Sequence, residues 1–143
     1  MTGNFELHPR LAADCIPVGH LSLSQLLLLN DARYPWFVLV PARREVTEVF
    51  ELDEEDQQQL WRESARLARY LKDICVADKI NIGALGNLVP QLHVHHIARF
   101  IGDPAWPGPV WGHSTAQPYE QVALQQRLDS VRNWFADELT GAT

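Results

Sequence analysis

Hydrophobic positions along the chain fall into short apolar runs and one long stripe of helical period. The runs at 26–30 and 36–40 flank a five-residue segment that contains an aspartate and a proline, which predicts a β-hairpin. From Asp53 to about Ala77 apolar residues recur every three or four positions. Three acidic residues follow Asp53, as expected at the start of a capped amphipathic helix.

The second half of the chain predicts two further strands, at 79–84 and 91–100, then a proline-rich loop at 103–112 and a last helix at 117–140. The stretch 46–52 is either a short strand or an extended lead into the long helix, and residues 1–20 show no clear period. The buried face of the last helix is predicted to carry Val122, Leu124, Leu128, Val131, Phe135 and Leu139.

This order of elements is typical of the α+β class, with a mostly antiparallel sheet covered by two main helices. The 143 residues suit one domain spanning 1–143. The hydrophobic content of 46% and the charged content of 21% are ordinary for a globular protein in water.

Charge and cysteine content narrow the possible partners and compartments. The net charge is −6 and no basic run occurs, so we expect no nucleic-acid partner. No apolar segment is long enough to cross a bilayer or resembles a signal peptide, so we expect a cytoplasmic protein without a membrane partner. Cys15 and Cys75 lie far apart and form no CxxC pair, which favours reduced thiols.

Half of the six histidines lie in one four-residue stretch, 93–96, of the strand predicted at 91–100. Side chains alternate between the two faces of a strand, so Gln91, His93 and His95 are predicted to share one face. His96 would then point to the other face. The row of three nitrogen-bearing side chains is the strongest candidate for chemistry in the chain.

Three interpretations of this row are open. The histidines are residues of a solvated sheet face, or they bind a metal ion together with His8, His20 or His113, none of which stands at a recognised ligand spacing. Alternatively, His93 is a nucleophile toward phosphorus, since a neutral imidazole is nucleophilic near pH 7 and can form a covalent intermediate. In that case His95 would hydrogen-bond a phosphate oxygen as charge develops.

The segment Gln-Leu-His-Val-His-His-Ile-Ala-Arg at 91–99 resembles the signature of the histidine triad (HIT) family, His-φ-His-φ-His-φ-φ, where φ is apolar and Pro-Arg often follows. With Arg99 at the arginine position, His93 matches the middle histidine, which is the family's nucleophile. His95 matches the third and Gln91 the first. The resemblance covers about 20–112, including a glycine- and asparagine-containing loop before the motif. It looks closest to a bacterial branch with the pattern Leu-Gly-Asn-φ-φ-Pro-Gln-φ-His-Val-His.

The resemblance implies a HIT-like fold, a homodimer with joined sheets, and a small-molecule nucleotide as partner. It implies in-line attack by His93 on the α-phosphorus of a nucleotide conjugate or dinucleoside polyphosphate, with no metal or other cofactor in the covalent step. Two classes compete with this hydrolase or transferase. One is a nucleotide-binding or interaction protein with little turnover, and the other is a metal-dependent hydrolase.

The sequence departs from the family pattern at two positions. Gln91 cannot act as a general acid, so the leaving-group end of the site is altered. His96 stands where the family usually has an apolar residue. It is predicted either as a half-buried strand histidine or as a helper at the edge of the pocket.

Substrate contacts are expected from the hairpin and from the loop before the motif. By resemblance, Asn30 helps to form the nucleotide site. The backbone at Gly86 would cradle a phosphate, with Asn81 and Asn87 adding donors, although both asparagines also suit ordinary turns.

Two further candidates follow the histidine motif. Arg99 would either counter the phosphate charge or pair with a surface carboxylate. Trp106, like Trp111, would lie over the nucleoside or at a subunit boundary, or else fill the core.

Overall fold

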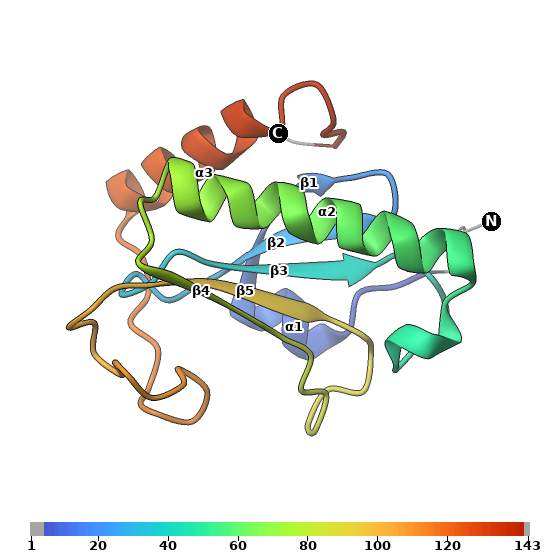
Figure 1. Ribbon diagram of the computed structural model, residues 1–143, viewed down its shortest axis with the longest axis horizontal. Helices are drawn as coiled ribbons and strands as arrows, with labels where there is room; N and C mark the ends of the chain where they lie inside the picture. Colours follow the sequence, from blue (N-terminus) through green and yellow to red (C-terminus); the bar gives the residue numbers. More distant parts are fainter. Residues whose placement is uncertain (1–4, 142–143) are drawn as a thin grey trace.

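A computed structural model describes residues 5–141 and shows one five-stranded antiparallel sheet with helices on both faces (Figure 1). The spatial order of the strands is β1-β2-β3-β5-β4. The strands are β1 (Cys15–His20), β2 (Ser24–Leu29), β3 (Trp36–Pro41), β4 (Lys79–Gly83) and β5 (Val94–Arg99). The helices are α1 (Pro9–Asp14), the 3-10 helix η1 (Val49–Glu51), α2 (Glu54–Asp73) and α3 (Gln121–Trp134).

The main core lies between the sheet and helices α2 and α3, which cover the same face (Figure 1). Alternating residues of β2 and β3 point into it, among them Leu26, Leu28 and Phe37. They meet the apolar stripe of α2, which includes Leu67 and Leu71. Burial of this stripe stabilises α2 far more than local propensity does.

A second cluster occupies the opposite face of the sheet. Leu27 and Val38 project into it from the central strands, and Leu11 covers them from α1. The loops before and after β5 complete the cover through Val89 and Val110. This face, roofed by a short helix and loops, carries the candidate site.

The structure confirms the α+β class, the antiparallel sheet, the hairpin and the long helix. The side chain of Asp53 accepts a hydrogen bond from the Asp56 amide at 2.8 Å, so the predicted cap is present. Of the two alternatives for 46–52, the strand does not form, because η1 forms there and its Glu51 side chain accepts from three donors of the preceding turn.

Boundaries differ from the predictions at both ends of the chain. Residues 1–20 contain α1 and β1, which lack a clear period because both are short. The last helix spans Gln121–Trp134 rather than 117–140, since the chain turns at Phe135 and Thr140 then pairs with His20. Val122, predicted on the buried face, lies in the first turn and is 72% exposed.

The predicted strand at 91–100 begins only at Val94. Pairing between β3 and β5 ends at Leu39 and Val94, and the Leu92 amide instead donates to the carbonyl of Val46. The three motif residues before this point, Gln91, Leu92 and His93, therefore lie outside the sheet. Among the described residues, no helix is long and apolar enough to cross a membrane.

Candidate active site

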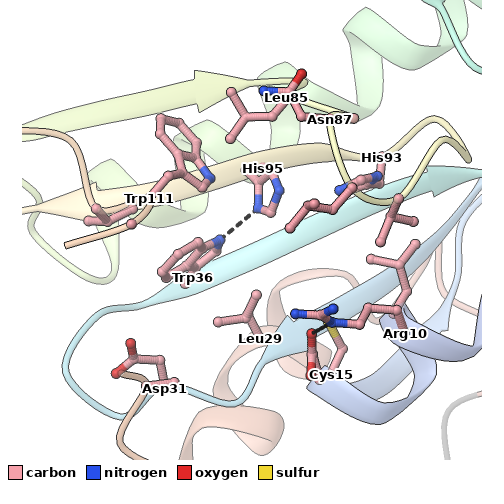
Figure 2. A pocket seen from close by; sticks show the side chains of 18 of the residues that line it. Arg10, Cys15, Leu29, Asp31, Trp36, Leu85, Asn87, His93, His95 and Trp111 are labelled. Carbon is pink, nitrogen blue, oxygen red and sulfur yellow. Dashed lines mark hydrogen bonds and ion pairs between the residues drawn. The ribbon is translucent and has the colours of Figure 1, made fainter. Parts of the chain in front are cut away.

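A pocket of about 460 Å³ opens on the sheet face that α2 and α3 leave uncovered. Its walls come from α1, the starts of β1, β3 and β5, the end of β2, and two loops at 85–89 and 110–116. Figure 2 shows His93 and His95 above Leu29, with Trp36 and Trp111 on one side and Arg10 on the other. Its size is ordinary for a small-molecule site.

His93 lies directly before β5 and is 7% exposed. Its Nδ1 is 2.7 Å from the carbonyl oxygen of Gln91. Because a carbonyl oxygen only accepts, Nδ1 carries the ring proton and donates it. The neutral ring therefore keeps its lone pair on Nε2, which is the atom required of a nucleophile.

His95 has the opposite arrangement of its two nitrogens. The indole Nε1 of Trp36 donates to Nδ1 of His95 at 2.9 Å, drawn as a dashed line in Figure 2. The proton of the neutral ring is therefore on Nε2. Burial, followed by the charges of His93 and His96, lowers the pKa of His95 to about 3. His95 is thus a neutral hydrogen-bond donor at physiological pH.

The rings of His93 and His95 lie close together, with centroids 5.0 Å apart. One ring presents a lone pair on Nε2 and the other an N–H at Nε2. A lone pair and a donor side by side match the needs of nucleophilic attack on a phosphate, where the attacking atom and an oxygen of the same group must both be engaged.

His96 points to the other side of the sheet and is fully buried. Its Nδ1 donates to the Val94 carbonyl at 3.0 Å, and its Nε2 accepts from the Ser64 hydroxyl of α2 at 2.7 Å. Burial lowers the pKa of His96 to about 4. The residue is therefore more buried than the half-buried histidine that was predicted, and it does not reach the pocket edge.

Asp31 and Arg33 form a polar end of the pocket that the sequence patterns did not reveal. Arg33 donates to both carboxylate oxygens of Asp31, at 3.0 and 2.9 Å. Burial alone would raise the pKa of Asp31, but the hydrogen bonds from Arg33 and from the Gln117 amide lower it below its ordinary value. Asp31 is therefore an ionised acceptor at neutral pH.

The family model described as the HIT domain matches residues 10–102 of this chain. The chain belongs to the histidine triad family. Its site histidines are those that the motif predicts for the nucleophile and the third histidine. Among curated proteins, none matches the sequence.

Solved structures of bacterial histidine triad proteins are similar to this HIT protein over almost its full length. One from Bradyrhizobium japonicum is 49% identical, with a TM-score of 0.89, covering 90% of this chain and 96% of that one. One from Sinorhizobium meliloti 1021 is 48% identical, with a TM-score of 0.90 and coverages of 93% and 98%. A third, from Marinobacter aquaeolei VT8, is 43% identical, with a TM-score of 0.91 and coverages of 94% and 98%.

Of the predicted substrate-binding residues, Gly86 and Asn87 line the pocket. Asn30 and Asn81 do not. The side chain of Asn30 accepts a hydrogen bond from the Tyr119 amide at 2.9 Å, and that of Asn81 accepts one from Arg99 at 2.8 Å. Both asparagines hold neighbouring chain segments instead of facing the cavity.

Arg99 and Trp106 also lie outside the residues that line the pocket. Arg99 is 1% exposed and donates to both carboxylate oxygens of Asp103 at 2.9 Å. Its guanidinium lies over the rings of Tyr34 and Trp106. Of the two roles predicted for Arg99, pairing with a carboxylate is the one that forms, although the carboxylate is buried and not on the surface. Arg99 does not line the pocket, and its charge fastens the loop that follows β5.

Gln91 does not complete a row with the two histidines. Its side-chain amide binds the backbone of residues 6 and 8, and it is not among the residues that line the pocket. The alternation of faces that the row required holds only within a strand, and β5 begins three residues later.

Several pocket residues carried no local signal in the sequence. Trp36 lay in an apolar run, and Arg10 and Cys15 lay in a segment without period, so only the fold brings them to the site. Burial and the charge of Asp14 raise the pKa of Cys15 to about 12, so its thiol stays protonated.

Within residues 5–141, no three His, Cys, Asp or Glu side chains are grouped as a metal ion requires.

Proposed function

We propose that this HIT protein is a nucleotide hydrolase or nucleotidyl transferase that forms a covalent intermediate on His93. The observation that carries the proposal is the pair of fixed tautomers, a lone pair on Nε2 of His93 beside an N–H on Nε2 of His95. Substrates of this chemistry are nucleotide conjugates and dinucleoside polyphosphates.

In the first step Nε2 of His93 forms a bond to the α-phosphorus. The bond from phosphorus to the leaving group breaks, and the leaving group departs with the electron pair. The positive charge that develops on the His93 ring is stabilised because Nδ1–H donates to the Gln91 carbonyl. The Nε2–H of His95 donates to a non-bridging oxygen as its negative charge increases.

In the second step a water oxygen, or the oxygen of another acceptor, bonds to phosphorus in line with the phosphorus–nitrogen bond. The phosphorus–nitrogen bond breaks and Nε2 recovers its electron pair. The proton of the attacking water leaves to the solvent, and a nucleoside monophosphate is released. Because the pKa of His95 is about 3, this residue acts as a hydrogen-bond donor and not as a general acid at neutral pH.

The composition of the pocket supports a nucleotide as the occupant. Gly86 and Asn87 are exposed residues that line the pocket, and backbone N–H groups of such a loop can bind an anion. Leu29, Val110 and Trp111 offer apolar and aromatic surface for the nucleoside. The ionised Asp31 is an acceptor for hydroxyl groups.

The proposal is tested by a turnover screen over nucleotide conjugates, with release of nucleoside monophosphate as the signal. His93→Ala is expected to lose more than about ten-fold in kcat, since its ring is the nucleophile, while its circular dichroism and thermal unfolding stay close to wild type. If His93→Ala keeps more than about a tenth of wild-type kcat, the nucleophile assignment is wrong. Tight nucleotide binding without turnover in the wild type would instead indicate a binding protein.

We also propose a homodimer. The edge strand β4 leaves one side unpaired within this sheet, and its Ile82 is 44% exposed. An edge of this kind is a template for pairing with a second copy. Light scattering at micromolar concentration is expected to give the dimer mass, and a monomer throughout that range would overturn this proposal.

A further inference from the structure

The side chain of Gln91 binds the segment that precedes α1. Its Nε2 donates to the Glu6 carbonyl at 2.8 Å, and its Oε1 accepts from the His8 amide at 2.8 Å. The side-chain amide thus donates to one backbone group and accepts from another two residues away, as the backbone of a neighbouring strand would do. The N-terminal segment is thereby fastened to the chain just before His93.

From this attachment the chain enters α1 and forms one wall of the pocket. His8 caps the helix, since its Nδ1 accepts from the Arg10 amide at 3.0 Å, and Leu11 is buried in the cluster beneath. Arg10 and Asp14, on the same side of α1, line the pocket. Figure 2 shows the Arg10 side chain extending from α1 into the cavity below His93.

Gln91 therefore contacts both sides of the site. Its main-chain carbonyl accepts from Nδ1 of His93, and its side chain holds the segment that leads to Arg10. A residue with this pair of contacts sets the position of α1 relative to the nucleophile.

Two guanidinium groups line the pocket, and they are held very differently. Arg33 makes three side-chain hydrogen bonds, two of them to Asp31, whose side chain is 2% exposed. Among residues 5–141, Arg10 has one ion pair, to Asp14 at 3.3 Å, and the two side chains are 61% and 53% exposed. An exposed pair of this kind on one helix is weak, so Arg10 can exchange Asp14 for an anion in the pocket.

We propose that Arg10 binds the phosphate chain of the leaving group, and that Gln91 is a positioning residue that places Arg10 beside His93. The inference rests on the proposed function of His93. Because Arg10 contacts the phosphate chain, this HIT protein is selective for leaving groups that carry phosphate over uncharged leaving groups. Contact with the leaving group, the role expected of the first motif position, is therefore made by Arg10 of α1 and not by Gln91.

The test compares two substrates of the same nucleoside, a dinucleoside polyphosphate and a nucleoside phosphoramidate whose alkylamine leaving group carries no phosphate. Arg10→Met is expected to lower kcat/KM for the polyphosphate by about ten-fold, the effect of a lost charge-assisted hydrogen bond, and to change the phosphoramidate much less. Arg69→Met is the matched control, since Arg69 also pairs with an aspartate four residues ahead on an exposed helix surface, away from the pocket.

The outcomes separate the two proposals. If wild type turns over neither substrate, the proposed function fails. If wild type is active and Arg10→Met changes both substrates equally, or changes neither, the inference about Arg10 is overturned.

Asp14 gives a test of opposite sign. Asp14→Asn removes the carboxylate that competes for Arg10, so kcat/KM for the polyphosphate is expected to rise. In the Arg10→Met background the same change is expected to have a smaller effect, because its partner is gone. Equal effects of Asp14→Asn in both backgrounds would show that Arg10 does not contact the phosphate chain.

Gln91 is tested by a measurement independent of activity. In Gln91→Leu the amide hydrogen of His8 is expected to exchange faster with solvent, because its acceptor is lost. The variant should also show the substrate pattern of Arg10→Met, with the polyphosphate affected more. Unchanged exchange at His8, or equal loss for both substrates, would overturn the positioning role of Gln91.

Discussion

At the scale of single residues, the two site histidines differ through the partners of their Nδ1 atoms. The Gln91 carbonyl accepts from His93, whereas the Trp36 indole donates to His95. Each partner determines which nitrogen of the neutral ring carries the proton. Two identical side chains therefore present opposite hydrogen-bonding groups to the same pocket.

Trp36→Phe should release the tautomer of His95 while keeping an aromatic ring in place. We expect kcat to fall by roughly ten-fold, the value of one buried hydrogen bond, with little change in KM. The ¹⁵N shifts of the His95 ring, measured by NMR, should change from a single tautomer to a mixture.

Trp111→Phe is the matched control for this prediction. Trp111 also meets the His95 ring edge-on, with centroids 5.6 Å apart, but its Nε1 has no hydrogen-bond partner among the described residues. The His95 tautomer should therefore be unchanged in Trp111→Phe. Identical ¹⁵N shifts in wild type and Trp36→Phe would show that Trp36 does not select the tautomer.

At the scale of elements, the loop after β5 is fastened by the buried pair of Arg99 and Asp103. Burial alone would raise the pKa of Asp103, but the hydrogen bonds and charge of Arg99 and the Phe100 and Trp106 amides lower it below its ordinary value. The pair fixes the first turn of the segment that continues to Val110 and Trp111 at the pocket.

Arg99→Met is expected to lower the free energy of unfolding by about 3–5 kcal/mol, since it leaves the buried carboxylate of Asp103 without its cation. Urea unfolding followed by circular dichroism measures this change. The double variant Arg99→Met with Asp103→Leu is expected to recover part of the loss. A loss below about 1 kcal/mol in Arg99→Met would show an exposed, weak pair instead.

The long elements could be predicted from the sequence because their signals are local. The stripe of α2 and the apolar runs of β2 and β3 have clear periods over enough residues. Short α1 and β1 have none, and their positions depend on burial of residues such as Leu11 against distant strands. The histidine motif could be recognised directly from the sequence, whereas Arg10, Asp31 and Trp36 reach the pocket only through tertiary contacts.

The difference between local sequence signals and tertiary contacts also explains why some predicted site residues do not line the pocket. The residue types of Arg99 and Asn81 suit a phosphate contact, but the sequence left open a carboxylate partner for Arg99 and an ordinary turn for Asn81. The structure joins them to each other across the pairing of β4 with β5. Residue type and spacing did not show which polar side chains would form hydrogen bonds within the protein and which would face the pocket.

At the scale of the whole molecule, two buried histidines make stability depend on pH. The pKa values of His95 and His96 are about 3 and about 4 in the folded protein, both below the ordinary value near 6.5. The unfolded chain therefore binds protons that the folded protein does not. Their contribution to stability is fully present above about pH 6.5 and is lost as pH falls toward 4.

The free energy of unfolding should be lower at pH 5 than at pH 7.5 by about 2 kcal/mol for each of the two histidines. Urea unfolding at several pH values measures this. In His96→Gln the pH dependence in this range should shrink by about half, because one titrating ring is removed. The lowered pKa values of Asp31 and Asp103 affect only more acidic solutions. Equal stability at pH 5 and pH 7.5 would contradict the assigned protonation of both rings.

Mass spectrometry of the intact protein detects a covalent nucleotide on His93 itself. A reacting mixture of wild type and an adenosine-containing substrate is stopped within one turnover at neutral or alkaline pH, where a phosphorus–nitrogen bond survives. We expect an added mass of one adenylyl group, located by peptide mapping on His93 and absent from His93→Ala. Turnover of the substrate without this adduct, or an adduct that persists in His93→Ala, would contradict a covalent intermediate on His93.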